Sequence, residues 1–377
     1  MKAEKVMGES SWTLHSDCVS AALTRNGGHV GPVEFELGGR VVAPMHVAPW
    51  AGQRTAATLM PILRVLRGDF FCMPFGGNTR AWHGEKHPVH GETANGTWSG
   101  ERLETLGKWT CLRASMETNT RPARVEKMIA LRAGDPAVYS RHVISGARGP
   151  MCLGHHAMLN CAKSPIRLSA SAFVRGQVFP DAFENPAEGG YSSLKPGGLF
   201  KSLAKVPLST GGYADLSRFP AREGFEDLVM ISSDPRSDFA WTAAVFSGEG
   251  YLWFTLRDPR VLASTVLWHS NGGRHYAPWN GRHSGVIGIE DVTAYFHCGL
   301  ADSAGPNPVN KAGIPTSVSL EKAVPVNSIF GVASVPRGFD VVEKVLRVEG
   351  GLEFVSPGGK RALVSLDSGF LYGEERP

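Results

Sequence analysis

The chain has 377 residues, of which 42% are hydrophobic and 20% charged, the composition of an ordinary globular protein. Its 39 basic residues slightly outnumber its 35 acidic ones, and like charges do not form long runs, which argues against nucleic acid as a partner. The lack of a long apolar segment argues against a membrane span or a membrane partner. Residues 1–5 lack the apolar core of a signal peptide, and the six cysteines form no CxxC pair, so we expect a cytoplasmic protein with reduced thiols.

Short apolar or alternating segments, separated by turns rich in glycine and proline, run along the whole chain. This pattern is typical of an all-β sandwich or barrel. The clearest helix signal lies at residues 55–66, where Gly68 would end the helix and Pro61 would kink or break it. The predicted strands, in chain order, are residues 30–35, 41–47, 137–144, 227–231, 241–246, 251–256, 285–289, 346–348, 352–355 and 362–366.

The chain shows no internal repeat, and we predict a single β domain over residues 1–377. Within it, residues 179–221 are rich in glycine, proline and serine. We interpret this segment as a long excursion or lid rather than a linker between domains.

The first segment with chemically active side chains follows an apolar strand at residues 70–75. It is a loop rich in glycine that carries Asn78, Arg80 and three histidines. Loops on a rigid scaffold are where binding groups concentrate. Gly91 directly after His90 lets a backbone or a ligand approach closely.

The same three histidines, His83, His87 and His90, could instead bind a metal ion, since imidazole is the commonest zinc ligand. Pro88 argues against this, because it breaks any helix that would place His83 and His87 on one face. We therefore predict no metal in the site, and keep a metal-dependent hydrolase or lyase as an open alternative.

Two further segments offer groups that can move a proton near neutral pH. His155 and His156 face opposite ways if they lie in a strand, so only one can point into a site. Glu290 ends an apolar run, where a carboxylate is costly to bury unless it is paired or functional. The aromatic residues Trp268 and Trp279 in the preceding stretch could stack on a sugar or pack in the core. A histidine satisfied in the core and a structural ion pair are the plainer interpretations.

These segments resemble motifs of the galactose mutarotase-like superfamily, which contains aldose 1-epimerases and hexose-6-phosphate epimerases. Pro88-Val89-His90-Gly91, with Trp98 beyond it, is similar to the first histidine motif of that family. His156, followed four positions later by Asn160, is similar to the second motif. Gly288-Ile289-Glu290 resembles the strand that carries the catalytic glutamate. The resemblance covers residues 30–335.

The resemblance implies a large antiparallel β-supersandwich with few short helices, and an aldose 1-epimerase that needs no cofactor. Glu290 would take the proton of the anomeric hydroxyl, His156 would protonate the ring oxygen, and His90 would hold the ring-oxygen side of the sugar. The expected residues for substrate binding are Asn78, Arg80, Trp268, Trp279 and Asp227, with Glu226 as the alternative to Asp227.

The chain also departs from the family pattern. Met158 and Leu159 stand where the family has aromatic residues, and Asp291 stands where proline often follows the glutamate. The expected partner is a small-molecule sugar or a sugar phosphate, for which Arg274 and Arg282 could supply charge. A carbohydrate-binding protein without catalysis is the second interpretation. We expect a monomer or a homodimer.

Overall fold

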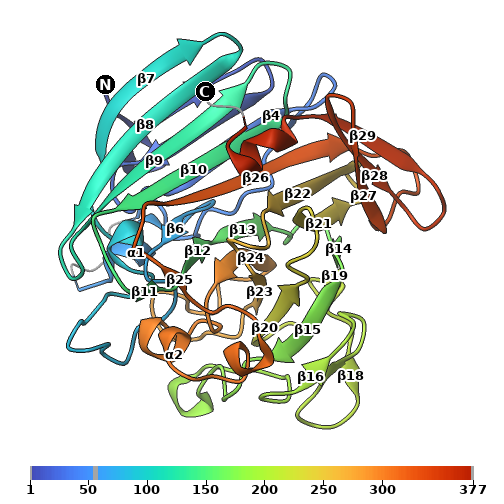
Figure 1. The fold of residues 1–377 in the computed structure, drawn as a ribbon. Coiled ribbons are helices and arrows are strands. Elements are labelled where there is room, and N and C mark those ends of the chain that lie inside the picture. The colour runs from blue at the N-terminus through green and yellow to red at the C-terminus, as the bar shows by residue number, and fades with distance from the viewer. Residues whose placement is uncertain (1, 54–57, 375–377) are drawn as a thin grey trace.

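Two large antiparallel sheets, of nine and eight strands, make up most of the molecule (Figure 1). The computed structural model describes residues 2–53 and 58–374. The larger sheet has the order β19-β14-β21-β22-β26-β10-β9-β8-β7. Its strands are β7 (Ser99–Leu106), β8 (Trp109–Thr118), β9 (Ala123–Arg132), β10 (Ala137–Ser145), β14 (Ile166–Ala170), β19 (Arg218–Phe219), β21 (Ala240–Phe246), β22 (Tyr251–Arg257) and β26 (Val324–Ser334).

The smaller sheet has the order β16-β15-β20-β23-β24-β12-β6, with β13 also paired to β24. Its strands are β6 (Phe71–Cys72), β12 (Leu153–His155), β13 (Ala157–Asn160), β15 (Phe173–Val178), β16 (Leu199–Phe200), β20 (Phe225–Ser233), β23 (Ser264–Asn271) and β24 (Val286–Thr293).

Shorter elements complete the fold. An N-terminal sheet contains β1 (Glu4–Val6), β2 (Glu9–His15), β3 (Val19–Thr24), β4 (Val30–Glu36) and β5 (Val41–Val42), and a C-terminal sheet contains β27 (Lys344–Val348), β28 (Gly351–Val355) and β29 (Arg361–Ser365). Two-stranded pairs join β11 (Pro150–Met151) to β25 (Val318–Ser319) and β17 (Val206–Pro207) to β18 (Tyr213–Ala214). The α-helices are α1 (Pro61–Val65) and α2 (Leu300–Ala304). The prediction of a large antiparallel all-β fold with few short helices is thus confirmed.

Apolar side chains fill two cores, one on each face of the nine-stranded sheet. Alternate residues of β22 divide between them, because successive side chains of a strand point to opposite faces. Tyr251 and Trp253 join the core shared with the eight-stranded sheet, whereas Leu252 and Phe254 pack toward the C-terminal sheet. The C-terminal sheet therefore covers a face that would otherwise be exposed.

The central strands of the eight-stranded sheet are buried along nearly their whole length. In β23 and β24 every residue is buried, polar ones included, so burial does not alternate along these strands. Charged residues within them are therefore conspicuous. Glu290 lies inside β24, which continues to Thr293, and does not end the strand as the sequence suggested.

The helix predicted at residues 55–66 is shorter than expected. Residues 55–57 lie outside the described part of the chain, and α1 begins at Pro61. Proline is tolerated at the first helical position because its missing N–H would have no partner there, so Pro61 starts the helix instead of breaking it. The strand predicted at 41–47 is also too long, since β5 ends at Val42. No helix in the described residues has the length and hydropathy needed to span a bilayer.

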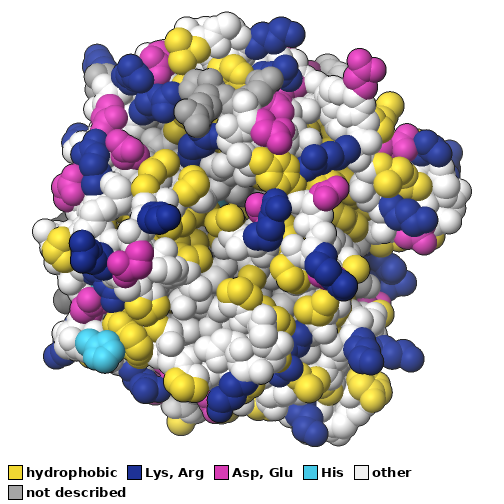
Figure 2. All heavy atoms as spheres, viewed as in Figure 1, with side chains coloured by type: hydrophobic (Ala, Val, Ile, Leu, Met, Phe, Trp, Pro, Cys, Tyr) yellow, Lys and Arg dark blue, Asp and Glu magenta, His cyan; other side chains and the backbone are white. Residues whose placement is uncertain are grey.

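Histidines are concentrated in the interior. Eight of the thirteen are buried: His29, His46, His90, His142, His155, His156, His269 and His283. The face shown in Figure 2 correspondingly displays almost no histidine, while basic and acidic side chains both occur across it. The interior position of the histidines bears both on the site and on the response of the fold to acid.

Candidate active site

The register of three strands places Glu290 beside Trp268 on one face of the eight-stranded sheet. Leu228 of β20 pairs with Trp268 of β23, and Trp268 pairs with Gly288 of β24. Side chains two residues apart in a strand share a face, so Glu290 lies on the same side as Gly288. Leu228, Trp268 and Glu290 accordingly line one cavity.

His156 reaches this cavity from the break between β12 and β13. Gly154 pairs with Val292 and Ala157 pairs with Ile289, so the unpaired interval lies opposite Glu290. The backbone N–H of His156 donates instead to the carbonyl of Phe70, at 2.9 Å. His155, its neighbour, points elsewhere and bonds Asp69 at 2.8 Å. The assignment of the second histidine position to His156 rather than His155 therefore agrees with the geometry.

The cavity has a volume of about 430 Å³ and brings together the three residues predicted to be catalytic, Glu290, His156 and His90. Nε2 of His156 lies 3.3 Å from Oε1 of Glu290. Both side chains are buried, and Oε2 of Glu290 and Nδ1 of His156 have no partner in the protein. Buried polar atoms are seldom left unpaired, which sets this pair apart from ordinary core residues.

Burial controls the protonation of this pair. It raises the pKa of Glu290 well above its ordinary value, against the opposing charge of Arg274, and lowers the pKa of His156 to about 3. Removal from water disfavours the charged form of each group. The pocket thus favours a protonated carboxyl beside a neutral imidazole. The sequence-based expectation of an ionised glutamate beside an imidazolium is reversed, while the pair still holds one transferable proton.

His90 is paired with a residue that the sequence did not reveal, His297. The two Nε2 atoms are 3.1 Å apart, and Nδ1 of His90 accepts from the backbone N–H of Gly76 at 3.4 Å. Because a backbone N–H can only donate, Nδ1 of neutral His90 must be the acceptor. His90 therefore carries its proton on Nε2 and donates it to Nε2 of His297. Burial lowers the pKa of His90 well below 6.5 and that of His297 to about 4.

The backbone at this histidine pair is strained, since His90 has φ 58° and Phe296, next to His297, has φ 46°. Non-glycine residues rarely adopt this left-handed region and are enriched at functional sites. The only sequence signal for His297 is its place in an aromatic stretch shortly after β24.

The two predicted tryptophans, Trp268 and Trp279, line the cavity together with Arg274. The guanidinium of Arg274 lies 5.1 Å from the ring centre of Trp268 and 4.7 Å from that of Trp279. Its Nε donates to Glu184 at 2.7 Å. Glu226 accepts from the indole N–H of Trp268 at 2.8 Å, and burial raises the pKa of Glu226 to about 7. The hydrogen bond to Glu226 therefore fixes the position of the Trp268 ring.

Asp227, predicted to bind substrate, lies outside this cavity. It follows Glu226 in β20 and faces the other side of the sheet, where it accepts hydrogen bonds from Ser193 and from the backbone of Leu194. There it borders a different cavity, of about 390 Å³, with His269. Sequence neighbours in a strand point to opposite faces, which is why Glu226 and Asp227 cannot both belong to the site.

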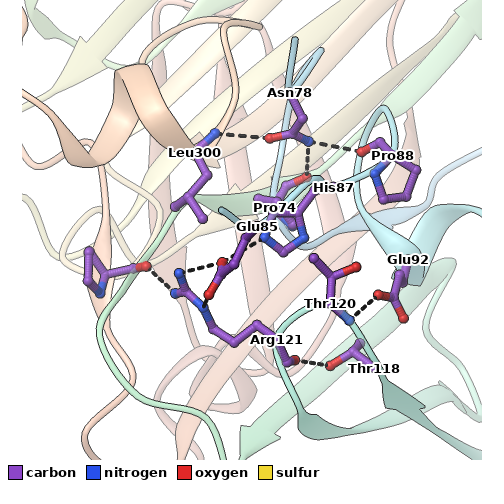
Figure 3. A network of polar contacts seen from close by, with 11 residues as sticks. Pro74, Asn78, Glu85, His87, Pro88, Glu92, Thr118, Thr120, Arg121 and Leu300 are labelled. Carbon is purple, nitrogen blue, oxygen red and sulfur yellow. Dashed lines mark hydrogen bonds and ion pairs between the residues drawn. The ribbon is translucent and has the colours of Figure 1, made fainter. Parts of the chain in front are cut away.

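Arg80 and Asn78 also lie outside the cavity. Arg80 is exposed and pairs with Asp302 at 2.6 Å. The amide of Asn78 donates to the carbonyls of Pro74 and Pro88 and accepts from the N–H of Leu300 (Figure 3). It also donates to the carbonyl of Gly76. Every polar atom of Asn78 is thus used to hold the loop that carries His90, a structural role rather than a substrate contact.

The three histidines considered as metal ligands do not converge. His83 is exposed, and His90 lies in the cavity. His87 bonds Glu85 at 2.9 Å, and Glu85 in turn pairs with Arg121 (Figure 3). In the described part of the chain, potential metal-ligating side chains do not gather in groups of three or more. The geometry offers no support for the metal-dependent alternative.

No protein-family model matches the sequence, and no curated protein matches it. Solved structures do match. A galactose mutarotase-like protein from Clostridium acetobutylicum is 10% identical, with a TM-score of 0.58 over 88% of this chain and 98% of its own. A galactose mutarotase related enzyme from Lactobacillus acidophilus is 12% identical, with a TM-score of 0.54 over 86% and 97%. A galactose mutarotase-like protein from Lactobacillus casei is 11% identical, with a TM-score of 0.52 over 85% and 99%. The chain has the galactose mutarotase-like fold.

Proposed function

We propose that this protein is an aldose 1-epimerase-like enzyme that interconverts the anomers of a sugar by opening and reclosing its ring. The observation that carries the proposal is the buried contact of 3.3 Å between His156 and Glu290, two residues that line one cavity and that each keep one polar atom unpaired within the protein. Proteins of the same fold named as galactose mutarotase related or mutarotase-like support it.

Ring opening needs one group that accepts a proton and one that donates a proton, and the pair supplies both. The anomeric hydroxyl gives its proton to His156 while Glu290 protonates the ring oxygen, and the bond from the anomeric carbon to the ring oxygen breaks to give the open-chain aldehyde. Rotation about the adjacent carbon–carbon bond presents the other face of the carbonyl. Reclosure returns both protons, so each turnover leaves the pair unchanged and consumes no cofactor.

The remaining cavity residues position the sugar. Trp268 and Trp279, held against Arg274, line the cavity and shape the space for a pyranose. The pair of His90 and His297 supports the ring-oxygen side, through exchange of its internal hydrogen bond for one to the sugar.

An uncharged sugar suits the cavity better than a sugar phosphate. The charge of Arg274 is balanced by Glu184, whose carboxylate lies 2.7 Å from its Nε, and Glu226 also attracts it. Arg282 is exposed and donates to the carbonyl of Pro278. We accordingly propose a neutral small-molecule sugar as the partner, in a cytoplasmic protein that acts as one β-supersandwich unit.

Anomer exchange measured by NMR on a panel of aldoses and hexose 6-phosphates tests the proposal. An enzyme accelerates exchange of at least one sugar, and Glu290→Gln abolishes the acceleration. A protein that only holds carbohydrate binds the sugar equally well with either residue and accelerates nothing. That result would overturn the proposal in favour of the binding function.

A further inference from the structure

The cavity is polar only at its deep end. Among the described residues that line it, the buried groups Glu290, His156 and His90 sit together with His297. Most of the remaining lining is apolar. The apolar members include Met60, Ile62 and Leu63, and the polar exceptions are Thr58, Arg274 and the hydroxyl of Tyr276, which donates to Glu184.

One wall is built by α1 and the residues just before it. Ile62 and Leu66 are buried beneath the wall, Leu63 is half-buried, and Met60 is exposed to 45%. Tyr276, which also lines the cavity, is exposed to 37%. Met60 and Tyr276 thus present apolar surface to solvent beside the cavity. A bare sugar ring would gain little from them, because its hydroxyls would lose water without finding partners.

The one charged group in the apolar part does not change this character. Arg274 donates to Glu184 and lies against the rings of Trp268, Trp279 and Phe183. Its charge is therefore already compensated within the protein. The volume of about 430 Å³ falls in the range of about 300–1,000 Å³ typical of pockets for ligands the size of a drug molecule.

We infer that the substrate is an amphipathic sugar: a pyranose with a free anomeric hydroxyl that carries an apolar acyl or alkyl substituent at the end remote from the anomeric carbon. The orientation rests on the proposed function, which places the anomeric carbon at Glu290 and His156. The ring then occupies the deep end, and the substituent lies along Leu63 and Met60 toward the opening. Burial of the chain against this wall supplies the binding energy that absent polar partners cannot.

Three probes test the inference by calorimetry, below their critical micelle concentrations: D-glucose, 6-O-octanoyl-D-glucose and n-octyl β-D-glucoside. The 6-O-octanoyl sugar binds at least about tenfold more tightly than glucose, because several buried methylenes contribute. The octyl glucoside carries its chain on the anomeric oxygen, so it cannot place ring and chain together and shows no such gain. Equal affinity for glucose and its octanoyl ester would overturn the inference.

Variants of the apolar wall test where the octanoyl chain binds. Met60→Ser and Leu63→Ser each reduce the preference for the octanoyl sugar several-fold, whereas Leu103→Ser, exposed to 44% on β7, leaves it unchanged. Met60 is exposed enough that its variant folds even if the Leu63 variant does not. A preference that survives both wall variants, or that extends to octyl glucoside, would contradict this placement of the ligand. Anomer exchange is recorded separately, so a preference without exchange contradicts the epimerase proposal and not the apolar wall.

Discussion

Glu226 and Asp227 are neighbours in β20 but belong to opposite faces of its sheet. On the side of the cavity, Glu226 accepts a hydrogen bond from the indole N–H of Trp268. On the other side, Asp227 accepts hydrogen bonds from the backbone N–H groups of Ser193 and Leu194. The two adjacent carboxylates therefore have different roles, and substitution of each is expected to change a different property of the protein.

Asp227→Ala is expected to lower stability with little effect on the site. The change leaves buried hydrogen-bond donors of Ser193 and Leu194 unpaired, which costs about 1–3 kcal/mol each. Chemical denaturation measures the loss, and the rate constant of the folded fraction stays near that of wild type. Glu226→Gln instead loosens Trp268 and weakens sugar binding. An Asp227 variant with normal stability and poor sugar affinity would refute the assignment of the two faces.

Removal of His297 is expected to slow ring opening without abolishing it. His297→Phe leaves the Nε2–H of His90 without its acceptor, so His90 loses its fixed orientation. We expect a fall in kcat/KM of about tenfold, the loss typical of one buried hydrogen bond. His297→Gln, which keeps an acceptor, restores part of the rate. If Phe and Gln at this position behave alike, the bond between the two histidines does not orient His90.

The free energy of unfolding is expected to fall steeply in mild acid. Burial lowers the pKa of His29 and His156 to about 3, and that of His46, His269 and His297 to about 4. These rings stay neutral in the folded state but take up protons near pH 6.5 once unfolded. As the pH falls from about 6.5 to about 4, each of these histidines lowers the free energy of unfolding by about 1.4 kcal/mol per pH unit.

Two buried glutamates change the free energy of unfolding with pH in the opposite direction over part of this range. The pKa values of Glu226 and Glu290 are raised, so their contribution is present below pH 4.5 and is lost as the pH rises through the pKa of each folded-state group, about 7 for Glu226. Because the buried histidines outnumber these glutamates, the free energy of unfolding is still expected to be larger at neutral pH than in mild acid. Urea unfolding at pH 7.5, 6.0 and 5.0 measures the slope. His46→Leu flattens it, whereas His15→Leu, at an exposed position, does not; equal slopes for both would contradict the account.

The sequence allowed the architecture and half of the site to be predicted, for physical reasons that differ by residue. Glu290 and His156 were recognisable because a charged or polar group stands out in an apolar run. His297 was not, since its contact with His90 spans 207 positions of the chain and leaves no local pattern. The sequence could not place Asp227 outside the cavity, because β20 is buried on both faces and alternation gives no hint of which side faces it.

The start of α1 and the position of Asn78 outside the cavity both have local causes. Pro61 was taken as a helix breaker, although at the first helical position it is favourable. Asn78 has the chemistry of a sugar ligand, yet its amide is consumed by four backbone contacts that only the folded loop reveals. The lid role of residues 179–221, which contain β16 to β19, stays a prediction.

The most direct test of the central claim, that Glu290 and His156 act together as the acid and the base of ring opening, is a comparison of anomer-exchange rates for Glu290→Gln, His156→Gln and the double variant. Each general acid or base contributes about 10²–10⁴ in rate. Because the pair acts as a unit, either single variant loses that factor and the double variant is no slower than the worse single one. Losses that multiply in the double variant, or a single variant that keeps the wild-type rate, would contradict the account.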